Sequence, residues 1–111
     1  MQHKNYWVYI LLCSNQSYYT GYTDNITKRY QSHRDGTGRC KYTRSFKPLR
    51  IAQCWLIKED KLLALRLERE IKKRSRQKKI ELILHPELLS SDPKVKVLQS
   101  ALLCSLLHRN S

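Results

Sequence analysis

The pattern of apolar and polar positions predicts three strands. Residues 7–13 and 18–23 are rich in aromatic and β-branched side chains, and the four residues between them are polar. That arrangement is typical of a β-hairpin. A third run, 51–57, is mostly apolar and predicts a buried strand.

The length of the hairpin loop decides where Tyr9 and Tyr19 lie relative to each other. Side chains alternate along a strand, and directly paired residues share a face. A three-residue loop at 14–16 pairs Leu11 with Tyr19 and places both tyrosines on one face. A two-residue loop places them on opposite faces unless a bulge intervenes. We predict the odd-length loop or a bulge.

Three helices are predicted around the third strand, each with capping candidates at its start. The first covers about 25–35 and stops at the glycines of 35–38. The second carries an apolar stripe of the kind that packs on a sheet. The cap candidates are Thr23, Asp24 and Asn25 for the first helix, Glu59 and Asp60 for the second, with the stripe Leu63, Leu67 and Ile71 and Ala64 beside it, and Ser75 for the third, which ends at His85-Pro86.

The tail predicts a further helix beginning near Asp92-Pro93. Its apolar face would hold Val97, Leu98, Ala101, Leu102, Ser105 and Leu106. The predicted fold is therefore α/β (α+β), a small three-stranded antiparallel sheet flanked by helices in the order β-β-α-β-α-α plus a C-terminal helix. We expect a domain at 1–89 and a helical extension at 90–111 that packs on it or on a protein partner.

Charge narrows the class of partner. The 111 residues carry 22 Lys and Arg against nine acids, a net charge of +13. Nucleic acid is the usual partner of such an excess, and a solvated basic surface is the alternative. The apolar run Val8–Cys13 is far shorter than the roughly 20 residues of a membrane span. With no signal-peptide layout and no C-x-x-C pair among the four cysteines, we expect a cytoplasmic protein.

Five side chains suit the cleavage of a phosphodiester bond. Tyr9 and Tyr19 lie on the two hairpin strands, Arg29 and His33 share one helix face, and Glu68 lies on a later helix. That chemistry needs a group to activate water, a cation beside the phosphate and a proton source. Each of these residues alone is more often structural. Taken by themselves they indicate a basic α/β domain that binds nucleic acid, with catalysis left open.

A family resemblance extends this interpretation. The chain resembles the GIY-YIG nuclease superfamily, and in particular its small bacterial single-domain members, over about residues 6–84. Two departures are a first motif that reads Trp-Val-Tyr-Ile and Thr20 where isoleucine is usual. The asparagine that follows the metal-binding glutamate in larger relatives is absent between 68 and 90. The matching segments are VYI (8–10), YTG (19–21), NITKRYQSH (25–33), GTGRCKYTR (36–44), LALRLEREIK (63–72) and SRQKK (75–79).

The resemblance implies a role for each candidate residue. Tyr9 and Tyr19 would line the site and orient or deprotonate the attacking water. Arg29 would stabilise the scissile phosphate, and His33 would be a proton shuttle or phosphate ligand. Glu68 would hold Mg²⁺ or Mn²⁺, with water and substrate oxygens completing the shell.

These roles imply a metal-dependent endonuclease that cleaves DNA, with structure-selective cleavage in repair or recombination as one form of the activity. The alternative is a non-catalytic nucleic-acid-binding or adaptor protein on the same fold, and RNA remains an alternative substrate. Residues 39–50, between the first helix and the third strand, are predicted to form a basic loop in which Pro48 discourages regular structure. The basic residues of this loop can contact phosphates. They are Arg39, Lys41, Arg44, Lys47 and Arg50.

Overall fold

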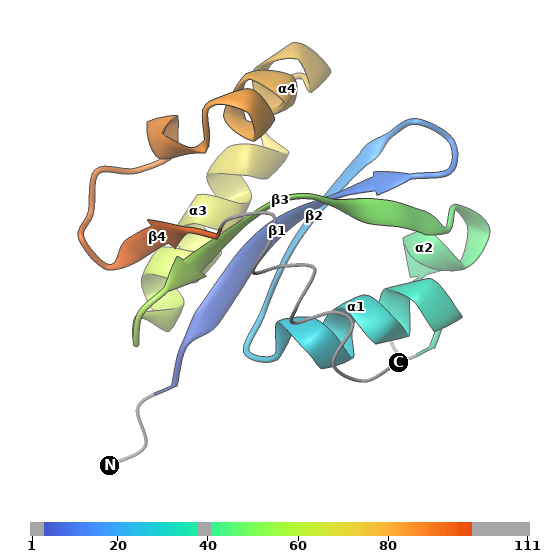
Figure 1. Ribbon diagram of the computed structural model, residues 1–111, viewed down its shortest axis with the longest axis horizontal. Coiled ribbons are helices and arrows are strands. Elements are labelled where there is room, and N and C mark those ends of the chain that lie inside the picture. Colours follow the sequence, from blue (N-terminus) through green and yellow to red (C-terminus); the bar gives the residue numbers. More distant parts are fainter. Residues whose placement is uncertain (1–3, 38–40, 99–111) are drawn as a thin grey trace.

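The computed structural model describes residues 4–37 and 41–98, which form a four-stranded antiparallel sheet with helices on both faces (Figure 1). The strand order is β2-β1-β3-β4. The strands are β1 (Tyr6–Cys13), β2 (Tyr18–Thr23), β3 (Pro48–Ile57) and β4 (Val95–Val97). The helices are α1 (Ile26–Asp35), α2 (Lys41–Ser45), α3 (Lys61–Lys72), α4 (Arg76–Leu84) and the 3-10 turn η1 (Pro86–Leu88). The α+β class and the antiparallel sheet are confirmed.

The fourth strand corrects the prediction of a three-stranded sheet. Residues 95–97 pair with the end of β3, with Trp55 opposite Val97, where the sequence predicted the first part of a helix. Asp92 sets this course, because its side chain accepts from the amide of Lys94 and its carbonyl accepts from the amide of Val95. The rest of the predicted C-terminal helix, 99–111, lies outside the described residues. The division into a domain and an extension stays a prediction.

A short helix, α2, also corrects the prediction of an irregular basic loop over 39–50. Lys41–Ser45 are helical, and β3 begins at Pro48 rather than at residue 51. Pro48 starts the strand, a position that needs no amide donor. The observed order is therefore β-β-α-α-β-α-α-β.

The hairpin has the predicted odd-length loop. Leu11 pairs with Tyr19, and the amide of Cys13 donates to the carbonyl of Ser17 at 2.9 Å. Paired residue numbers therefore have an even sum, and Tyr9 and Tyr19 lie on the same face of the sheet. The prediction of a shared face is confirmed.

The three predicted N-caps form as expected and fix where the helices begin. Each capping side chain accepts a hydrogen bond from the amide three residues on, which satisfies one of the unpaired donors of the first turn. The pairs are Asn25 with Lys28, Asp60 with Leu63, and Ser75 with Lys78. Gly36, with φ at 70°, ends α1 in the left-handed conformation that glycine tolerates best.

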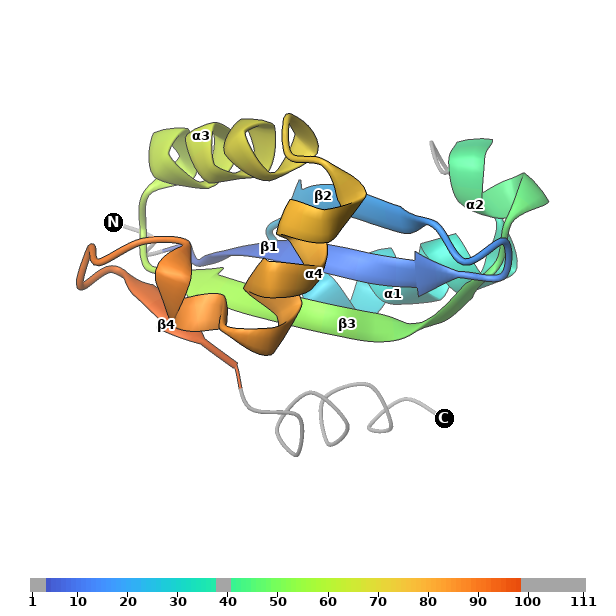
Figure 2. The ribbon, with the colours of Figure 1, turned by 90° about the horizontal axis from the view of Figure 1, so that it is seen from above.

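The sheet separates two cores. On one face, β1 and β3 pack under α3 and α4, and on the other they pack against α1. Figure 2 shows the same layers from above, with α4 crossing in front of the strands and α1 behind them. The first core includes Val8, Ile10, Trp55, Ile57, Leu63, Ala64, Leu67, Ile71, Leu82 and Leu89, and the second includes Tyr9, Leu11, Cys13, Ile26 and Cys54. Within the described residues, no helix has the length and apolar character that a membrane crossing requires.

Candidate active site

Three of the five predicted residues are joined by hydrogen bonds on the face that α1 covers. The Tyr9 hydroxyl lies 2.8 Å from Nε2 of His33, and Nε of Arg29 donates to the same hydroxyl at 3.4 Å. Arg29 and His33 reach one point because they lie four residues apart on α1. β1 supplies the tyrosine from beneath, so a strand and a helix fix the group together.

Gly21 provides the space that Tyr9 occupies. It pairs with Tyr9 across the hairpin, and a Cβ on Gly21 would lie 2.6 Å from the Tyr9 hydroxyl oxygen. Such a contact is far inside van der Waals distance. The glycine of the second motif therefore allows the phenol of the first to lie flat across β2 and reach His33.

Tyr19 completes the cluster from β2. Its ring meets the His33 ring edge-on, with centroids 5.1 Å apart. Tyr9 is only 1% exposed, whereas Tyr19 is partly exposed. Of the two tyrosines, Tyr19 is therefore the one that can reach solvent in this conformation.

His33 is neutral in the folded protein. The residue is fully buried, and burial together with the nearby Arg29 guanidinium lowers its pKa to about 4. A neutral imidazole has one donor and one acceptor nitrogen. This burial could not be predicted from the sequence, because a histidine on a basic helix is more often exposed to solvent.

The hydrogen bonds of His33 fit a neutral imidazole protonated at Nδ1, and we assign this tautomer. Arg29 can only donate, so the Tyr9 oxygen accepts from it, and in this assignment the Tyr9 proton is donated to Nε2 of His33. Nδ1 of His33 then carries the ring proton and donates to Oγ1 of Thr43, 2.9 Å away. This assignment satisfies all four groups without a second proton on the ring.

Thr43 was missed by the sequence analysis, which placed it in a loop. It is completely buried and belongs to α2. Its contact with His33 depends on α2 folding against α1, and nothing local in the sequence reports that. The only signal is a hydroxyl residue within a stretch that is otherwise basic and aromatic.

Two aromatic residues of the same segment were also missed. Tyr42 stacks on Tyr19, with centroids 5.7 Å apart and planes 21° apart, and Phe46 follows at 5.3 Å from Tyr42. Their spacing of four residues was a usable signal, because it places both rings on one face of a short helix.

Glu68 is not joined to this cluster by any contact among the described residues. It lies on α3, which packs on the opposite face of the sheet, and its charged partner is Lys72, with 3.7 Å between Oε1 and Nζ. The side chain is only 13% exposed, which is low for a carboxylate with one distant partner. Such a group has unused capacity to accept a cation.

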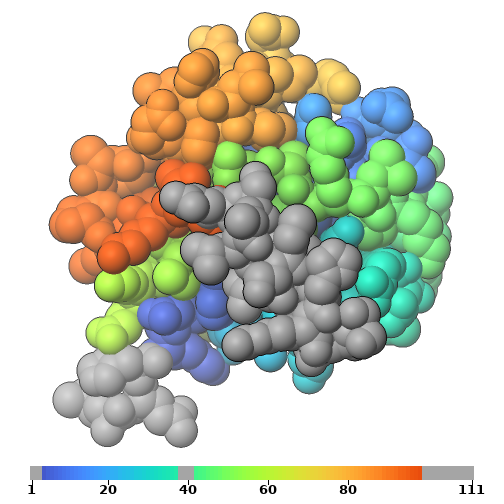
Figure 3. Space-filling model, viewed as in Figure 1, coloured from blue at the N-terminus to red at the C-terminus, as the bar shows by residue number. Residues whose placement is uncertain are grey.

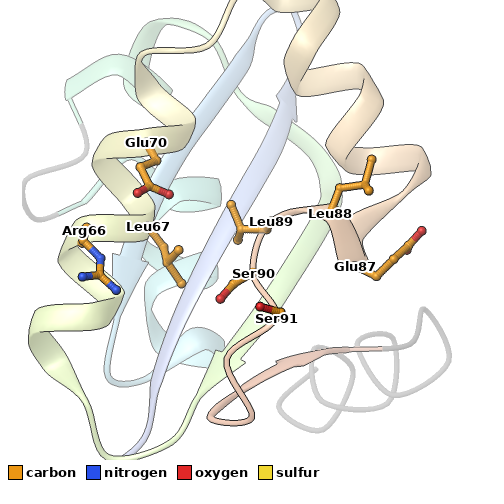
Figure 4. A pocket seen from close by; sticks show the side chains of 8 residues that line it. All are labelled: Arg66, Leu67, Glu70, Glu87, Leu88, Leu89, Ser90 and Ser91. Carbon is orange, nitrogen blue, oxygen red and sulfur yellow. The ribbon is translucent and has the colours of Figure 1, made fainter.

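The direction of Glu68 follows from its neighbours on α3. Arg66 and Glu70 line a cavity of about 600 Å³ shared with η1 and the segment after it (Figure 4). Glu68 lies about 200° around the helix from Glu70. It therefore faces away from η1, toward the side on which α3 packs against the outer strand β2.

Lys79 lies within electrostatic range of residues from both groups. Burial lowers the pKa of Lys79, Lys72 lowers it further, and the Tyr42 phenol opposes the change. Lys72 is the charged partner of Glu68, and Tyr42 stacks on Tyr19.

The predicted phosphate contacts are only partly described. Arg39 lies outside the described residues, as does the side chain of Lys41. Arg44 and Arg50 are exposed, and Lys47 is exposed and donates to the carbonyl of Arg34 at 3.0 Å. Their role in binding stays a prediction.

The cysteines of the described region are structural. Cys13 and Cys54 are free and buried, and burial raises the pKa of both thiols. Residues 4–37 and 41–98 contain no cluster of three or more His, Cys, Asp or Glu side chains that could enclose a metal ion.

Comparison with known proteins identifies the family. The GIY-YIG catalytic domain family matches residues 5–81. The UPF0213 protein of Syntrophus aciditrophicus is 46% identical over 81 residues, which cover 72% of this chain and 90% of the relative. The UPF0213 protein BH0048 of Halalkalibacterium halodurans is 43% identical over 79 residues, covering 71% and 82%.

A solved structure is among the similar proteins. The solution NMR structure of UPF0213 protein BH0048 from Bacillus halodurans is 42% identical, covers 72% of this chain and 83% of that chain, and superposes with a TM-score of 0.48. The chain belongs to the GIY-YIG family and, within it, to the small UPF0213 proteins.

Proposed function

We propose that this protein is a metal-dependent endonuclease that hydrolyses phosphodiester bonds of DNA. The observation that carries the proposal is the hydrogen-bonded group of Tyr9, His33 and Arg29 beside the partly exposed Tyr19. A buried polar group is costly to fold unless every member is satisfied, and this one lies directly beside a phenol that reaches solvent.

The two tyrosines would have different tasks. Tyr19 is open to solvent and would orient the attacking water at the phosphate. Tyr9 is buried and would hold the arginine and the histidine in position. Arg29 stays protonated, and its planar fork suits the oxygens of the scissile phosphate.

His33 would orient Tyr9 rather than bind phosphate. It is completely buried, so a phosphate cannot reach it in this conformation. Its Nε2 lies 2.8 Å from the Tyr9 hydroxyl. Because the pKa of the imidazole is lowered to about 4, it is a weak base, and its task would be to hold the Tyr9 hydroxyl beside Arg29.

Glu68 fits a divalent metal ion. One largely buried carboxylate, paired only at 3.7 Å, is a hard oxygen donor with room for a cation. Mg²⁺ and Mn²⁺ suit such a site, because Mg²⁺ keeps several waters and often takes only one or two carboxylates. When bound, the ion would supply neutralisation of charge on the phosphate.

The experiment is a cleavage assay on labelled branched, nicked, single-stranded and duplex DNA, and on RNA, with Mg²⁺, Mn²⁺ or EDTA. Glu68→Ala should lose activity by orders of magnitude, because a bound ion supplies several kcal/mol of transition-state stabilisation. Glu70→Ala is the matched control, because Glu70 lies on the same helix but faces the cavity beside η1. It should cleave like the wild type.

The outcomes separate the two functions. Cleavage by both variants at the wild-type rate, or equal wild-type cleavage in EDTA, would contradict the metal role of Glu68. Tight binding of nucleic acid with no cleavage of any substrate would support the adaptor alternative instead.

A further inference from the structure

An aromatic platform extends from the candidate active site to the surface. We define it as Tyr42 and Phe46 together with the Tyr19 ring against which Tyr42 stacks. All three rings follow one another at 5.7 and 5.3 Å between centroids, and Tyr42 and Phe46 are each 37% exposed. In Figure 3, α2, the start of β3 and the hairpin tip adjoin at one end of the molecule.

The connection between β1 and β2 holds the platform in place. Nδ2 of Asn15 donates to the Tyr42 hydroxyl at 3.2 Å, and the Ser17 hydroxyl also hydrogen-bonds to it. Both partners belong to the hairpin loop, so Tyr42 ties α2 to the hairpin. A ring fixed in this way loses little conformational freedom when a ligand stacks beside it.

Basic residues lie near the platform. Arg44 and Lys47 are within two residues of Phe46 in the sequence, and Lys47 donates to the carbonyl of Arg34 at the end of α1. Arg76 lies over the Tyr18 ring at 4.9 Å from its centroid, on the other face of the same hairpin. Aromatic rings with basic residues nearby suit a polymer that alternates π-faces with phosphates.

We propose that the aromatic platform binds an unpaired nucleobase next to the bond to be cut, so that the protein prefers single-stranded or locally unpaired nucleic acid. In a duplex both faces of each base are covered by neighbouring bases, so a side chain can stack only on a base that has left the stack. Within the platform, Tyr19 contacts both the His33 ring and the Tyr42 ring. A base stacked there would place its own phosphate beside the reacting group.

The proposal rests on the proposed function where it states that a bond beside the base is cut. Its test measures binding and does not require cleavage. Binding is measured in EDTA by fluorescence anisotropy. The ligands are a labelled single-stranded DNA, a single-stranded RNA of the same sequence and the DNA duplex. Both single strands offer unpaired bases, so the comparison of their affinities shows whether the base comes from DNA or from RNA.

Phe46→Ala should weaken single-strand binding by roughly 5- to 100-fold, the range for one lost base–aromatic stack. Duplex affinity should change less than twofold, and the salt dependence should stay the same because no cation is removed. Leu49→Ala is the matched control, because Leu49 is an apolar residue of the same segment, 55% exposed and outside the platform. Phe46→Leu keeps the apolar volume and should reproduce the loss.

A single-strand affinity of the Phe46 variants within twofold of the wild type would overturn the proposal. An equal loss on the duplex would overturn it as well. If Phe46→Ala does not fold, Phe46→Leu decides alone. If binding depends on Phe46 but the protein cleaves no substrate, the endonuclease proposal is refuted while the binding proposal stands.

Discussion

The buried, neutral His33 should make the folded protein sensitive to mild acid. In the unfolded chain the imidazole has a pKa of 6.5, and in the folded state it is about 4. Between these values the unfolded state binds a proton that the folded state does not. Stability is therefore complete above about pH 6.5 and falls as the pH drops toward 4.

The size of the loss follows from the two pKa values. Each pKa unit corresponds to about 1.36 kcal/mol, so the difference of about 2.5 allows a total loss of about 3 kcal/mol. About 2 kcal/mol of this should already be lost between pH 7.5 and pH 5.0. Lys4 lowers the pKa of Asp24, and the Leu63 amide together with Lys94 lowers the pKa of Asp60. The contribution of these two carboxylates to stability is lost only as the pH falls below about 4, outside this interval.

The measurement is urea unfolding at pH 7.5 and pH 5.0, followed by the fluorescence of the buried Trp55. His33→Gln cannot titrate and should lose far less stability over this interval, whatever its stability at pH 7.5. His85→Gln is the control, because the His85 side chain is 64% exposed. An equal pH dependence in the wild type and His33→Gln would refute the reasoning, as would an NMR titration of His33 with a midpoint near 6.5.

Two further predictions concern buried hydroxyls. Thr43→Val removes the acceptor for Nδ1 of His33 and should cost about 1 kcal/mol of stability while allowing both ring tautomers; ¹⁵N chemical shifts of the His33 ring would report the mixture. Thr43→Ser should keep a single tautomer, and an unchanged ring spectrum in Thr43→Val would disprove the assignment. The Thr20 hydroxyl is buried with no hydrogen-bond partner among the described residues. Thr20→Val should therefore stabilise the fold by roughly 1 kcal/mol in urea unfolding, and a loss of stability would show that the hydroxyl is satisfied.

Features set by short-range interactions were predictable from the sequence. The N-caps at Asn25, Asp60 and Ser75 depend on an amide three residues away, so the residue type alone indicates them. The shared face of Tyr9 and Tyr19 follows from the period of a strand and the length of one loop.

Features set by distant parts of the chain were not predictable. β4 pairs with the end of β3 and packs Val95 against the core, but its apolar spacing also fits a helix. In α4 both Leu82 and Leu84 are apolar, yet Leu82 is buried and Leu84 is 69% exposed. A helix that is apolar around much of its circumference does not reveal which side will meet a sheet. The partnership of Thr43 with His33 similarly requires two helices to come together.

The close fit of Gly21 against Tyr9 restricts how this protein can be redesigned. A Cβ at position 21 would lie 2.6 Å from the Tyr9 hydroxyl oxygen and 2.8 Å from the ring carbon that bears it. Removing the hydroxyl alone, as in Tyr9→Phe, would therefore leave the second clash in place. A side chain at position 21 becomes compatible only with a residue at position 9 that lacks a six-membered ring. The two positions lie on different strands but behave as one steric unit, so a library that varies position 21 while Tyr9 is kept would consist mostly of clashing variants.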